Sequence, residues 1–297
     1  MILFDGTTVA AVLEQEIIRQ LQELARPVTV CSFFFAEDAG STLYTRLKTE
    51  AAERVGITYQ SQQCSFFEPV AVLIERIRVA NSDPMITGVL IQKPTKQIWN
   101  QFCPEENRVG EGHTFGEWWQ SLTSALDPAK DVDGLSPDTL AVIAAGNWRE
   151  QGRVLPATCR AVVSILVMLK EQHPEKETQN ASIVGVSDLL GTPLYHVLTQ
   201  LGLEVQLLRR AEFLEKTQNG TQPLETDIVV SATGVPNLIT GAHILPGAVV
   251  IDVGEPKPDV DQNSVAEKAF FLTPVPGGVG PLTVMCLLSN AVDLLKK

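Results

Sequence analysis

The chain has 297 residues, which suggests about two domains, since a compact domain holds roughly 150 residues. Acidic residues outnumber basic ones by 35 to 23, giving a net charge of −12 at pH 7. Nucleic-acid binding needs surfaces rich in Lys and Arg, so this acidity disfavours it. The longest strongly apolar stretch, residues 161–169, is much shorter than the roughly 20 residues that span a bilayer.

Cysteine and histidine usage indicates the compartment and argues against a metal. The five cysteines are widely scattered and form no Cys-x-x-Cys pair, and the four histidines lack the spacing of metal ligands. This pattern is typical of reduced thiols in a cytoplasm. Residues 1–6 contain no basic segment of the kind that begins a signal peptide. We therefore expect a cytoplasmic protein with no metal site and no membrane segment.

The first half of the chain alternates between predicted helices and strands. Helical periodicity or caps predict helices at residues 8–24, 41–55 and 70–80, and apolar runs predict strands at 27–35 and 87–92. Ser41 is expected to cap the second helix, and Gly56 to end it. Such alternation predicts a parallel sheet whose ligands bind at the carboxyl ends of the strands.

The second half begins after a region of different composition. Residues 101–115 are polar and contain glycine, which predicts a long loop or insertion, and Trp118 and Trp119 follow. Composition shifts again near residue 146, where we place a domain boundary. Beyond it we expect a helix at 161–171 and strands at 181–186, 203–208, 227–231, 248–253 and 269–273. The fold class is therefore α/β with two domains.

A glycine turn follows the first strand of this second series. Gly185, Ser187 and Gly191 form a Gly-x-Ser-x-x-x-Gly pattern between a strand and a helix, where backbone N–H groups can bind a pyrophosphate. A plain tight turn is an equally good interpretation of this pattern alone. The next strand ends at Arg209 and Arg210, which would suit the 2′-phosphate of NADP or form a solvated basic pair.

Tyr44 and Lys48 are four residues apart and share one face of a predicted helix. The same Tyr-x-x-x-Lys spacing occurs in short-chain dehydrogenases, but there it follows the glycine turn, whereas here it lies far upstream. That family is therefore disfavoured, and the pair by itself is also typical of a surface helix.

Residues 130–134 read Lys-Asp-Val-Asp-Gly and could belong to a calcium loop. Placing Gly134 sixth in such a loop puts Ala129 first and Leu140 last, so both end ligands are missing. The segment therefore indicates an Asp-rich turn.

Residues 272–283 form the most specific pattern in the chain. Three prolines and three glycines follow an apolar strand, and this composition restricts the backbone to a defined loop that a ligand can approach closely. The alternative is an ordinary connecting loop, which would not need so many constrained residues.

Taken together and in this order, the motifs resemble one family. Tyr-x-x-x-Lys, Gly88 to Pro94, Lys-Asp-Val-Asp-Gly, the glycine turn and the loop at 272–283 are similar to those of bifunctional methylenetetrahydrofolate dehydrogenase/methenyltetrahydrofolate cyclohydrolase, the FolD family. The resemblance implies two α/β domains around a cleft and a homodimer. It places the folate-binding catalytic domain at 1–146 plus 281–297, and a Rossmann-type NAD(P)-binding domain at 147–280.

The resemblance also implies roles for residues on the folate side. Lys48 matches the catalytic lysine, Gln92 the glutamine beside it, and Tyr44 the ring that stacks on the pterin. Asp133 matches the aspartate that binds the amino edge of the pterin. The loop that lines the folate site matches Pro276, Gly277 and Gly278.

On the cofactor side the implied ligand is NADP, with NAD as a second candidate. The residues that match this role are Gly185, Ser187, Gly191, Thr192, Arg209 and Arg210. The implied chemistry oxidises 5,10-methylenetetrahydrofolate to a methenyl cation, which is then hydrolysed to 10-formyltetrahydrofolate. A lysine can accept protons at neutral pH only if a fraction of its molecules carry a neutral amine. Burial beside a hydrogen-bonding glutamine is expected to lower the pKa of the lysine and so to increase that fraction.

The chain departs from the family pattern mainly on the cofactor side. Val186 replaces the usual arginine of the glycine turn, Asp188 adds a negative charge there, and Cys159 stands where the family has proline. Lys93 stands between Gln92 and Pro94 in place of leucine. The alternatives are thus a cyclohydrolase with weak or absent dehydrogenase activity, a non-catalytic folate-binding paralogue, and a different NAD(P) dehydrogenase of the same plan.

Overall fold

The computed structural model describes residues 1–24, 26–219 and 224–296. The chain divides into two compact units, each made of two segments. The six-stranded unit comprises residues 1–13 and 156–286, and the three-stranded unit comprises residues 14–155 and 287–297. Both contain parallel sheets and helices, which confirms the α/β class. The division falls after Leu155 instead of after residue 146, and it assigns the first residues of the chain to the six-stranded unit.

The six-stranded unit is built on one parallel sheet. Its strands lie in the order β1-β9-β8-β7-β5-β6 among the described residues. Their bounds are β1 Ile2–Leu3, β9 Phe271–Leu272, β8 Val249–Asp252, β7 Ile228–Ser231, β5 Asn180–Val184 and β6 Glu204–Leu208. The chain crosses from β6 over β5 to reach β7, so the strand order changes direction at β5. In sheets of this kind, ligands bind beyond the carboxyl ends of the strands at such a point.

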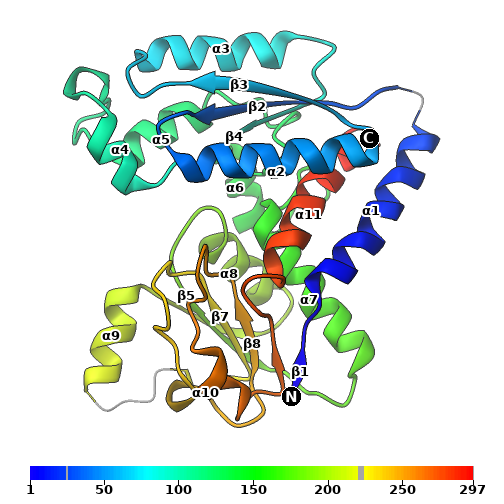
Figure 1. Cartoon of the computed structure of the whole chain (residues 1–297), viewed down its shortest axis with the longest axis vertical. Coiled ribbons are helices and arrows are strands. Elements are labelled where there is room, and N and C mark those ends of the chain that lie inside the picture. The colour runs from blue at the N-terminus through cyan, green and yellow to red at the C-terminus, as the bar shows by residue number, and fades with distance from the viewer. Residues whose placement is uncertain (25, 220–223, 297) are drawn as a thin grey trace. The chain divides into compact units, whose positions relative to one another are not determined.

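The three-stranded unit has its own parallel sheet, ordered β3-β2-β4 in the part of the chain that the structure describes. The strands are β2 Thr29–Phe35, β3 Thr58–Cys64 and β4 Gly88–Ile91. Figure 1 shows α2 (Ala39–Val55) along one face of this sheet and α3 (Val70–Ser82) along the other. Because β2 is central, its residues are almost all buried, and they form the apolar layer on which both helices pack.

The remaining helices connect and cover these sheets. They are α1 Gly6–Glu23, α4 Lys96–Phe102, α5 Phe115–Thr123, α6 Pro137–Ala145, α7 Ala157–Gln172, α8 Gly191–Gln200, α9 Arg210–Gln218, α10 Gln262–Ala266 and α11 Val279–Asp293, with 3-10 turns η1 Glu105–Asn107 and η2 Gly241–His243. None of the helices formed by the described residues combines the length and the apolar composition needed to cross a membrane.

The cap of α2 differs from the prediction. Asp38, not Ser41, is the N-cap, and its Oδ1 accepts from the backbone N–H groups of Gly40 (2.9 Å) and Ser41 (3.2 Å). A carboxylate on extended backbone just before the helix can reach two free N–H groups, whereas Ser41 is already inside the first turn. Gly56 ends the helix at φ 88°, as predicted.

Residues 101–115, expected to be a long loop, are mostly loop, with the 3-10 turn η1 inside it and the ends of α4 and α5 on either side. Thr114 and Glu117 make a capping box at the start of α5. The flanking helices carry Trp99 and Trp118, which are almost fully buried and pack together with their ring centroids 6.0 Å apart. Burial of these two side chains holds both ends of the loop in place.

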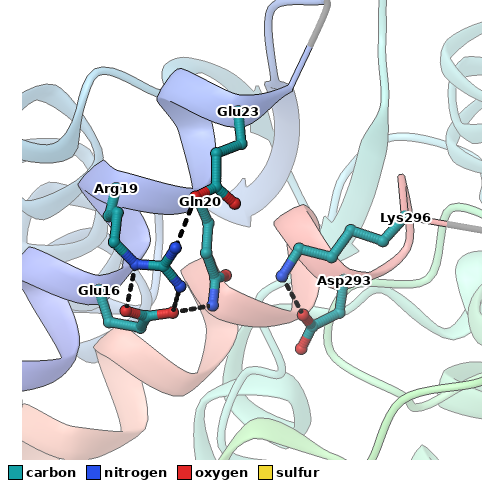
Figure 2. Close-up of polar contacts among 6 residues, drawn as sticks. All are labelled: Glu16, Arg19, Gln20, Glu23, Asp293 and Lys296. Carbon is teal, nitrogen blue, oxygen red and sulfur yellow. Dashed lines mark hydrogen bonds and ion pairs between the residues drawn. The ribbon is translucent and has the colours of Figure 1, made fainter.

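Figure 2 shows the polar side chains near the ends of α1 and α11 in the three-stranded unit. Arg19 donates from Nε to Glu16 (2.9 Å) and from Nη1 to Glu23 (2.5 Å), and Lys296 pairs with Asp293 (3.3 Å). Hydrogen bonds from Arg19 and then Gln20 lower the pKa of Glu16 to about 2. The side chains of the ion pairs are each more than about a third exposed, so the network contributes little to stability.

The start of α1 contacts the loop that precedes α11. The N–H of Gly6 donates to the carbonyl of Gly277 (2.9 Å), and a Cβ on Gly6 would lie only 1.8 Å from the oxygen of Gly278. The nearest atoms are the backbone carbonyl oxygens of Gly277 and Gly278, and moving them would distort the loop. Gly6 is therefore required by the close approach of two backbone segments.

Gly6→Ala is expected to destabilise the protein by about 1–3 kcal/mol, the usual range for overpacking a buried contact. Gly280→Ala is the matched control, because a Cβ there meets nothing within 4 Å and the position is helical. The control should be neutral or slightly stabilising. Urea unfolding measures both, and equal stabilities of the two variants would contradict the prediction.

Candidate active site

A buried lysine and a glutamine meet in the three-stranded unit. Lys48 lies in the middle of α2, and Gln92 follows β4 directly. The ammonium Nζ of Lys48 donates to Oε1 of Gln92 at 2.8 Å, although Lys48 is only 6% exposed. Gln92 is held in turn by its backbone N–H, which donates to the carbonyl of Phe33 on β2 (2.7 Å). The structure thus brings together two of the predicted site residues.

The surroundings of Lys48 change its proton affinity. Burial lowers its pKa, because removing water disfavours the charged ammonium, and the negative charge of Asp133 opposes this effect in part. Desolvation is the larger of the two causes. A lysine in these surroundings is neutral over a wider range of pH than one in water, as a proton-transferring group requires.

Asp133 is positioned by a short segment that runs beside β4. Val89 donates from its N–H to the carbonyl of Lys130 (2.7 Å), so the chain just before Asp133 is fixed to the strand that leads to Gln92. The amide of Asn290 donates to the carbonyls of Val132 and Leu155, both at 2.9 Å. The end of α11 therefore holds the residue next to Asp133 in place.

Asp131 has a structural function. It is fully buried, and its carboxylate accepts from the N–H groups of Leu135 (3.1 Å) and Ser136 (2.7 Å). These bonds close the turn that precedes α6, which matches the prediction of an Asp-rich turn. Burial raises the pKa of Asp131, with the backbone hydrogen bonds opposing this shift.

Three buried hydroxyl groups lie around this site, on Tyr44, Ser32 and Tyr59. The hydroxyl oxygen of Tyr44 has no hydrogen-bond partner. Tyr44 lies one helical turn before Lys48, as predicted, whereas no motif pointed to Ser32 or Tyr59. The alternation of β2 and β3 could have placed those two on one sheet face, but only with the strand register known. Burial raises the pKa of Tyr59, an interaction with the Ser32 hydroxyl opposes this shift, and the charge of Asp133 adds to it.

The glycine turn lies in the six-stranded unit at the carboxyl end of β5. Gly185 has φ 122°, and a Cβ there would lie 2.3 Å from the carbonyl oxygen of Ala232 beyond β7. A Cβ on Gly191 would lie 1.8 Å from the oxygen of Gly185. Only glycine fits these positions, and the turn lies where the strand order changes direction. This backbone arrangement fits the pyrophosphate of a dinucleotide.

Ser187 organises the interior of this turn. Its Oγ accepts from the N–H groups of Leu190 (3.3 Å) and Gly191 (3.5 Å), and its carbonyl accepts from the N–H of Thr192 (2.9 Å). The N–H groups at the start of α8 therefore donate to Ser187 within the turn. The two bonds to Oγ are long, and a bound phosphate would share or replace them.

The two predicted phosphate-binding arginines follow β6. Arg209 is exposed and pairs loosely with Glu212 (3.7 Å), and Arg210 is exposed at the first position of α9. Both extend from the strand next to β5 in the sheet. Exposed cations at this place fit both interpretations of the sequence, a contact with the 2′-phosphate of NADP and a solvated basic pair.

The loop of Pro276, Gly277 and Gly278 belongs to the six-stranded unit, whereas Lys48, Gln92 and Asp133 belong to the other. Pro276 is exposed, and Gly277 has φ 94°. A Cβ on Gly278 would lie 2.4 Å from the oxygen of Pro274. The glycines of this loop therefore lie where its backbone closely approaches itself and the start of α1.

Two buried carboxylates beyond β7 and β8 escaped the sequence analysis. Asp252 accepts from the N–H of Val260 (3.0 Å), and Asp259 accepts from the hydroxyls of Ser231 and Thr233, both at 2.9 Å. Burial, with a smaller effect of the Asp259 charge, raises the pKa of Asp252 to about 6. Together they fix the loops beside the glycine turn.

The fold and these sites define a class of two-unit α/β enzymes with a dinucleotide-binding sheet and a separate buried lysine. Two family matches make the class specific. Residues 4–105 match the tetrahydrofolate dehydrogenase/cyclohydrolase catalytic domain, and residues 156–297 match the NAD(P)-binding domain of the same family. The chain belongs to the tetrahydrofolate dehydrogenase/cyclohydrolase family, which confirms the resemblance.

Relatives and solved structures agree over the whole chain. Bifunctional protein FolD 2 of Lactobacillus johnsonii is 32% identical over 99% of this chain and 98% of its own. Bifunctional protein FolD of Limosilactobacillus reuteri is 34% identical over 98% and 96%. The Trypanosoma brucei FolD structure, complexed with NADP and an inhibitor, has a TM-score of 0.82 at 26% identity over 99% and 97%. The Campylobacter jejuni FolD structure has a TM-score of 0.81 at 25% identity over 99% and 98%.

The lowered pKa of Lys48 predicts a pH-dependent stability difference between the wild type and Lys48→Met. Between the lowered pKa and the usual value of about 10.4, the unfolded chain binds more protons than the folded chain. Wild-type stability should therefore rise with pH across this window relative to Lys48→Met, which cannot titrate there.

Urea unfolding between neutral pH and about pH 10 measures this difference. The exposed Lys216 provides the control, since Lys216→Met should run parallel to the wild type. Parallel curves for Lys48→Met and the wild type would show that Lys48 has an ordinary proton affinity.

Proposed function

We propose that Lys48 transfers the protons of a folate one-carbon reaction, with Gln92 and Asp133 as its partners. The family activity is the NADP-dependent oxidation of 5,10-methylenetetrahydrofolate to 5,10-methenyltetrahydrofolate, followed by hydrolysis to 10-formyltetrahydrofolate. The observation that carries the assignment is the 2.8 Å hydrogen bond between a buried Lys48 and Gln92. Burial also lowers the pKa of Lys48, as a proton-transferring amine requires.

In the hydrolytic step, a water molecule attacks the methenyl carbon and loses a proton to the neutral Nζ of Lys48. The new hydroxyl then gives its proton to solvent as the formyl C=O forms, and the bond to one ring nitrogen breaks with its electron pair going to that nitrogen. The ammonium of Lys48 returns its proton to this nitrogen, so the reaction releases one proton overall. The oxygen of Gln92 accepts a hydrogen bond from Nζ and so holds the amine in position to take the proton from the attacking water.

Tyr44 and Asp133 orient the substrate in this proposal. Tyr44 lies on the same face of α2 as Lys48, so its ring can stack on a flat pterin while Nζ reaches the one-carbon unit. Asp133 can accept hydrogen bonds from the N–H groups of the pterin, and a charged acceptor strengthens such bonds. Pro276, Gly277 and Gly278 would line the folate site by their backbone.

For the cofactor, we assign the binding of NADP to the glycine turn and the two arginines. Gly185 and Gly191 allow the pyrophosphate to approach the backbone, with Ser187 and Thr192 as polar neighbours. Arg209 and Arg210 would pair with the 2′-phosphate, which distinguishes NADP from NAD. Bound NADP supplies the acceptor for the hydride that leaves the methylene group.

We further propose a homodimer that works in the cytoplasm. The five cysteines are free and buried, as in a protein kept in a reducing compartment. Size-exclusion chromatography with light scattering tests the dimer directly, and a monomer at micromolar concentration would contradict it.

Lys48→Met is expected to lower cyclohydrolase turnover by at least about a hundredfold, the lower end for loss of a general base. Substrate binding should change far less, because Tyr44 and Asp133 remain. Steady-state assays of both activities and a folate-binding titration measure these effects. Cyclohydrolase turnover close to that of the wild type would disprove the role of Lys48.

Arg209→Ser together with Arg210→Ser is expected to raise the KM for NADP about tenfold or more while leaving the KM for NAD nearly unchanged. The reason is that only NADP carries the 2′-phosphate. Arg149→Ser, which removes an exposed arginine from the three-stranded unit, serves as the control. Equal effects on the two cofactors would reject the phosphate contact.

A further inference from the structure

Lys93, which follows Gln92, lies against two aromatic rings. Its Nζ is 5.0 Å from the centroid of the Trp119 ring and 5.9 Å from that of Phe115. Both distances are within the roughly 6 Å over which a cation is attracted to the face of a ring. Lys93 is only half-buried, but Trp119 is almost fully buried, so the ring forms a fixed support for the ammonium.

The support belongs to α5, the helix that follows the predicted loop at residues 101–115. Trp118, the neighbour of Trp119 on α5, packs against Phe35 of β2 with ring centroids 5.2 Å apart and against Phe66 at 5.7 Å. The rings beneath Lys93 are therefore joined to the core of the three-stranded sheet. Phe115, one of the two rings against Lys93, itself packs on Trp118 with ring centroids 6.0 Å apart.

Gln92 and Lys93 reach opposite faces of that sheet. Gln92 contacts Lys48 on α2, whereas Lys93 contacts α5, as expected for successive residues of an extended chain. The next residues are held as well, because the N–H of Thr95 donates to Oδ2 of Asp38 at 2.8 Å. Asp38 also caps α2, the helix that carries Lys48.

We propose that Lys93 is a positioning residue: its contact with Trp119 and Phe115 fixes the backbone of Gln92, so that Oε1 of Gln92 stays on Nζ of Lys48. Residues 96–123 act as the support for this contact. The inference rests on the proposed role of Lys48 and extends it to a residue and a segment outside the reacting atoms.

Positioning and direct charge make opposite predictions for the proton affinity of Lys48. If Gln92 moves away, the ammonium loses its acceptor, and the pKa of Lys48 falls further. If Lys93 acted only through its positive charge, removing it would instead raise the pKa of Lys48. Burial and Asp133 are the two influences that the structure shows on this pKa, and Lys93 is not among them.

Three variants separate these cases. Lys93→Met removes the charge and keeps most of the stem, Trp119→Leu removes the ring and keeps the charge, and Lys93→Arg keeps both the charge and the stacking. The matched control is Arg149→Met, because Arg149 lies 4.2 Å from the Trp148 ring in the same unit, away from Gln92 in the chain.

The measurements are cyclohydrolase kcat and KM, the titration of Lys48 by NMR of 13C-labelled lysine, and urea unfolding. We expect Lys93→Met and Trp119→Leu to lower kcat about tenfold, part of the contribution of general acid–base catalysis, with KM changed less. Both should lower the pKa of Lys48, and Lys93→Arg should restore it. Because Trp119→Leu removes a large buried side chain, Lys93→Met alone decides the outcome if that variant fails to fold.

An unchanged titration of Lys48 in Lys93→Met, or a shift to higher pH, would overturn the inference. The same holds if Arg149→Met has an equal effect. Failure of the proposed function looks different, because Lys48→Met itself would then retain cyclohydrolase activity, whatever Lys93→Met does.

Discussion

The arrangement of the three-stranded unit depends on one constraint: the amine of Lys48 is buried, and it must still have a hydrogen-bond acceptor. Burying an isolated ammonium is strongly unfavourable. A buried lysine therefore needs a hydrogen-bond acceptor, and burial lowers its pKa because it disfavours the charged form. Gln92 supplies the acceptor at 2.8 Å, and Asp133 supplies a compensating charge. Three segments of the chain, α2, the end of β4 and the stretch beside it, must therefore converge on one nitrogen atom.

Much of this organisation could be predicted from the sequence. The periodicity of apolar residues and the glycines and prolines that end helices and strands are local signals. Gly56 ends α2 through a positive φ that glycine adopts freely, and the alternation of strands with helices predicted parallel sheets. The pairing of Lys48 with Gln92 was expected only through family resemblance. Nothing in the spacing of these two residues indicates that they meet.

Other features depend on tertiary contacts that a sequence does not display. Asp38 caps α2 in place of Ser41, and the second oxygen of its carboxylate receives the N–H of Thr95 from a distant segment. Helices α4 and α5 are stabilised by burial of Trp99 and Trp118, and Trp118 packs against Phe35 of β2. Asp252 and Asp259 were missed for the same reason, since each is defined by the loops around it.

The order of the segments along the chain has a consequence for how the protein forms during synthesis. The sheet of the three-stranded unit lies within residues 29–91, so it can assemble once that stretch is made. The other sheet pairs β1 at Ile2–Leu3 with β9 at Phe271–Leu272, which requires nearly the whole chain. Such distant pairing closes slowly. Asn290, which holds the residue next to Asp133, also arrives late. The helix that carries Lys48 can therefore pack on its sheet early, whereas the contact from Asn290 that holds the residue next to Asp133 forms last.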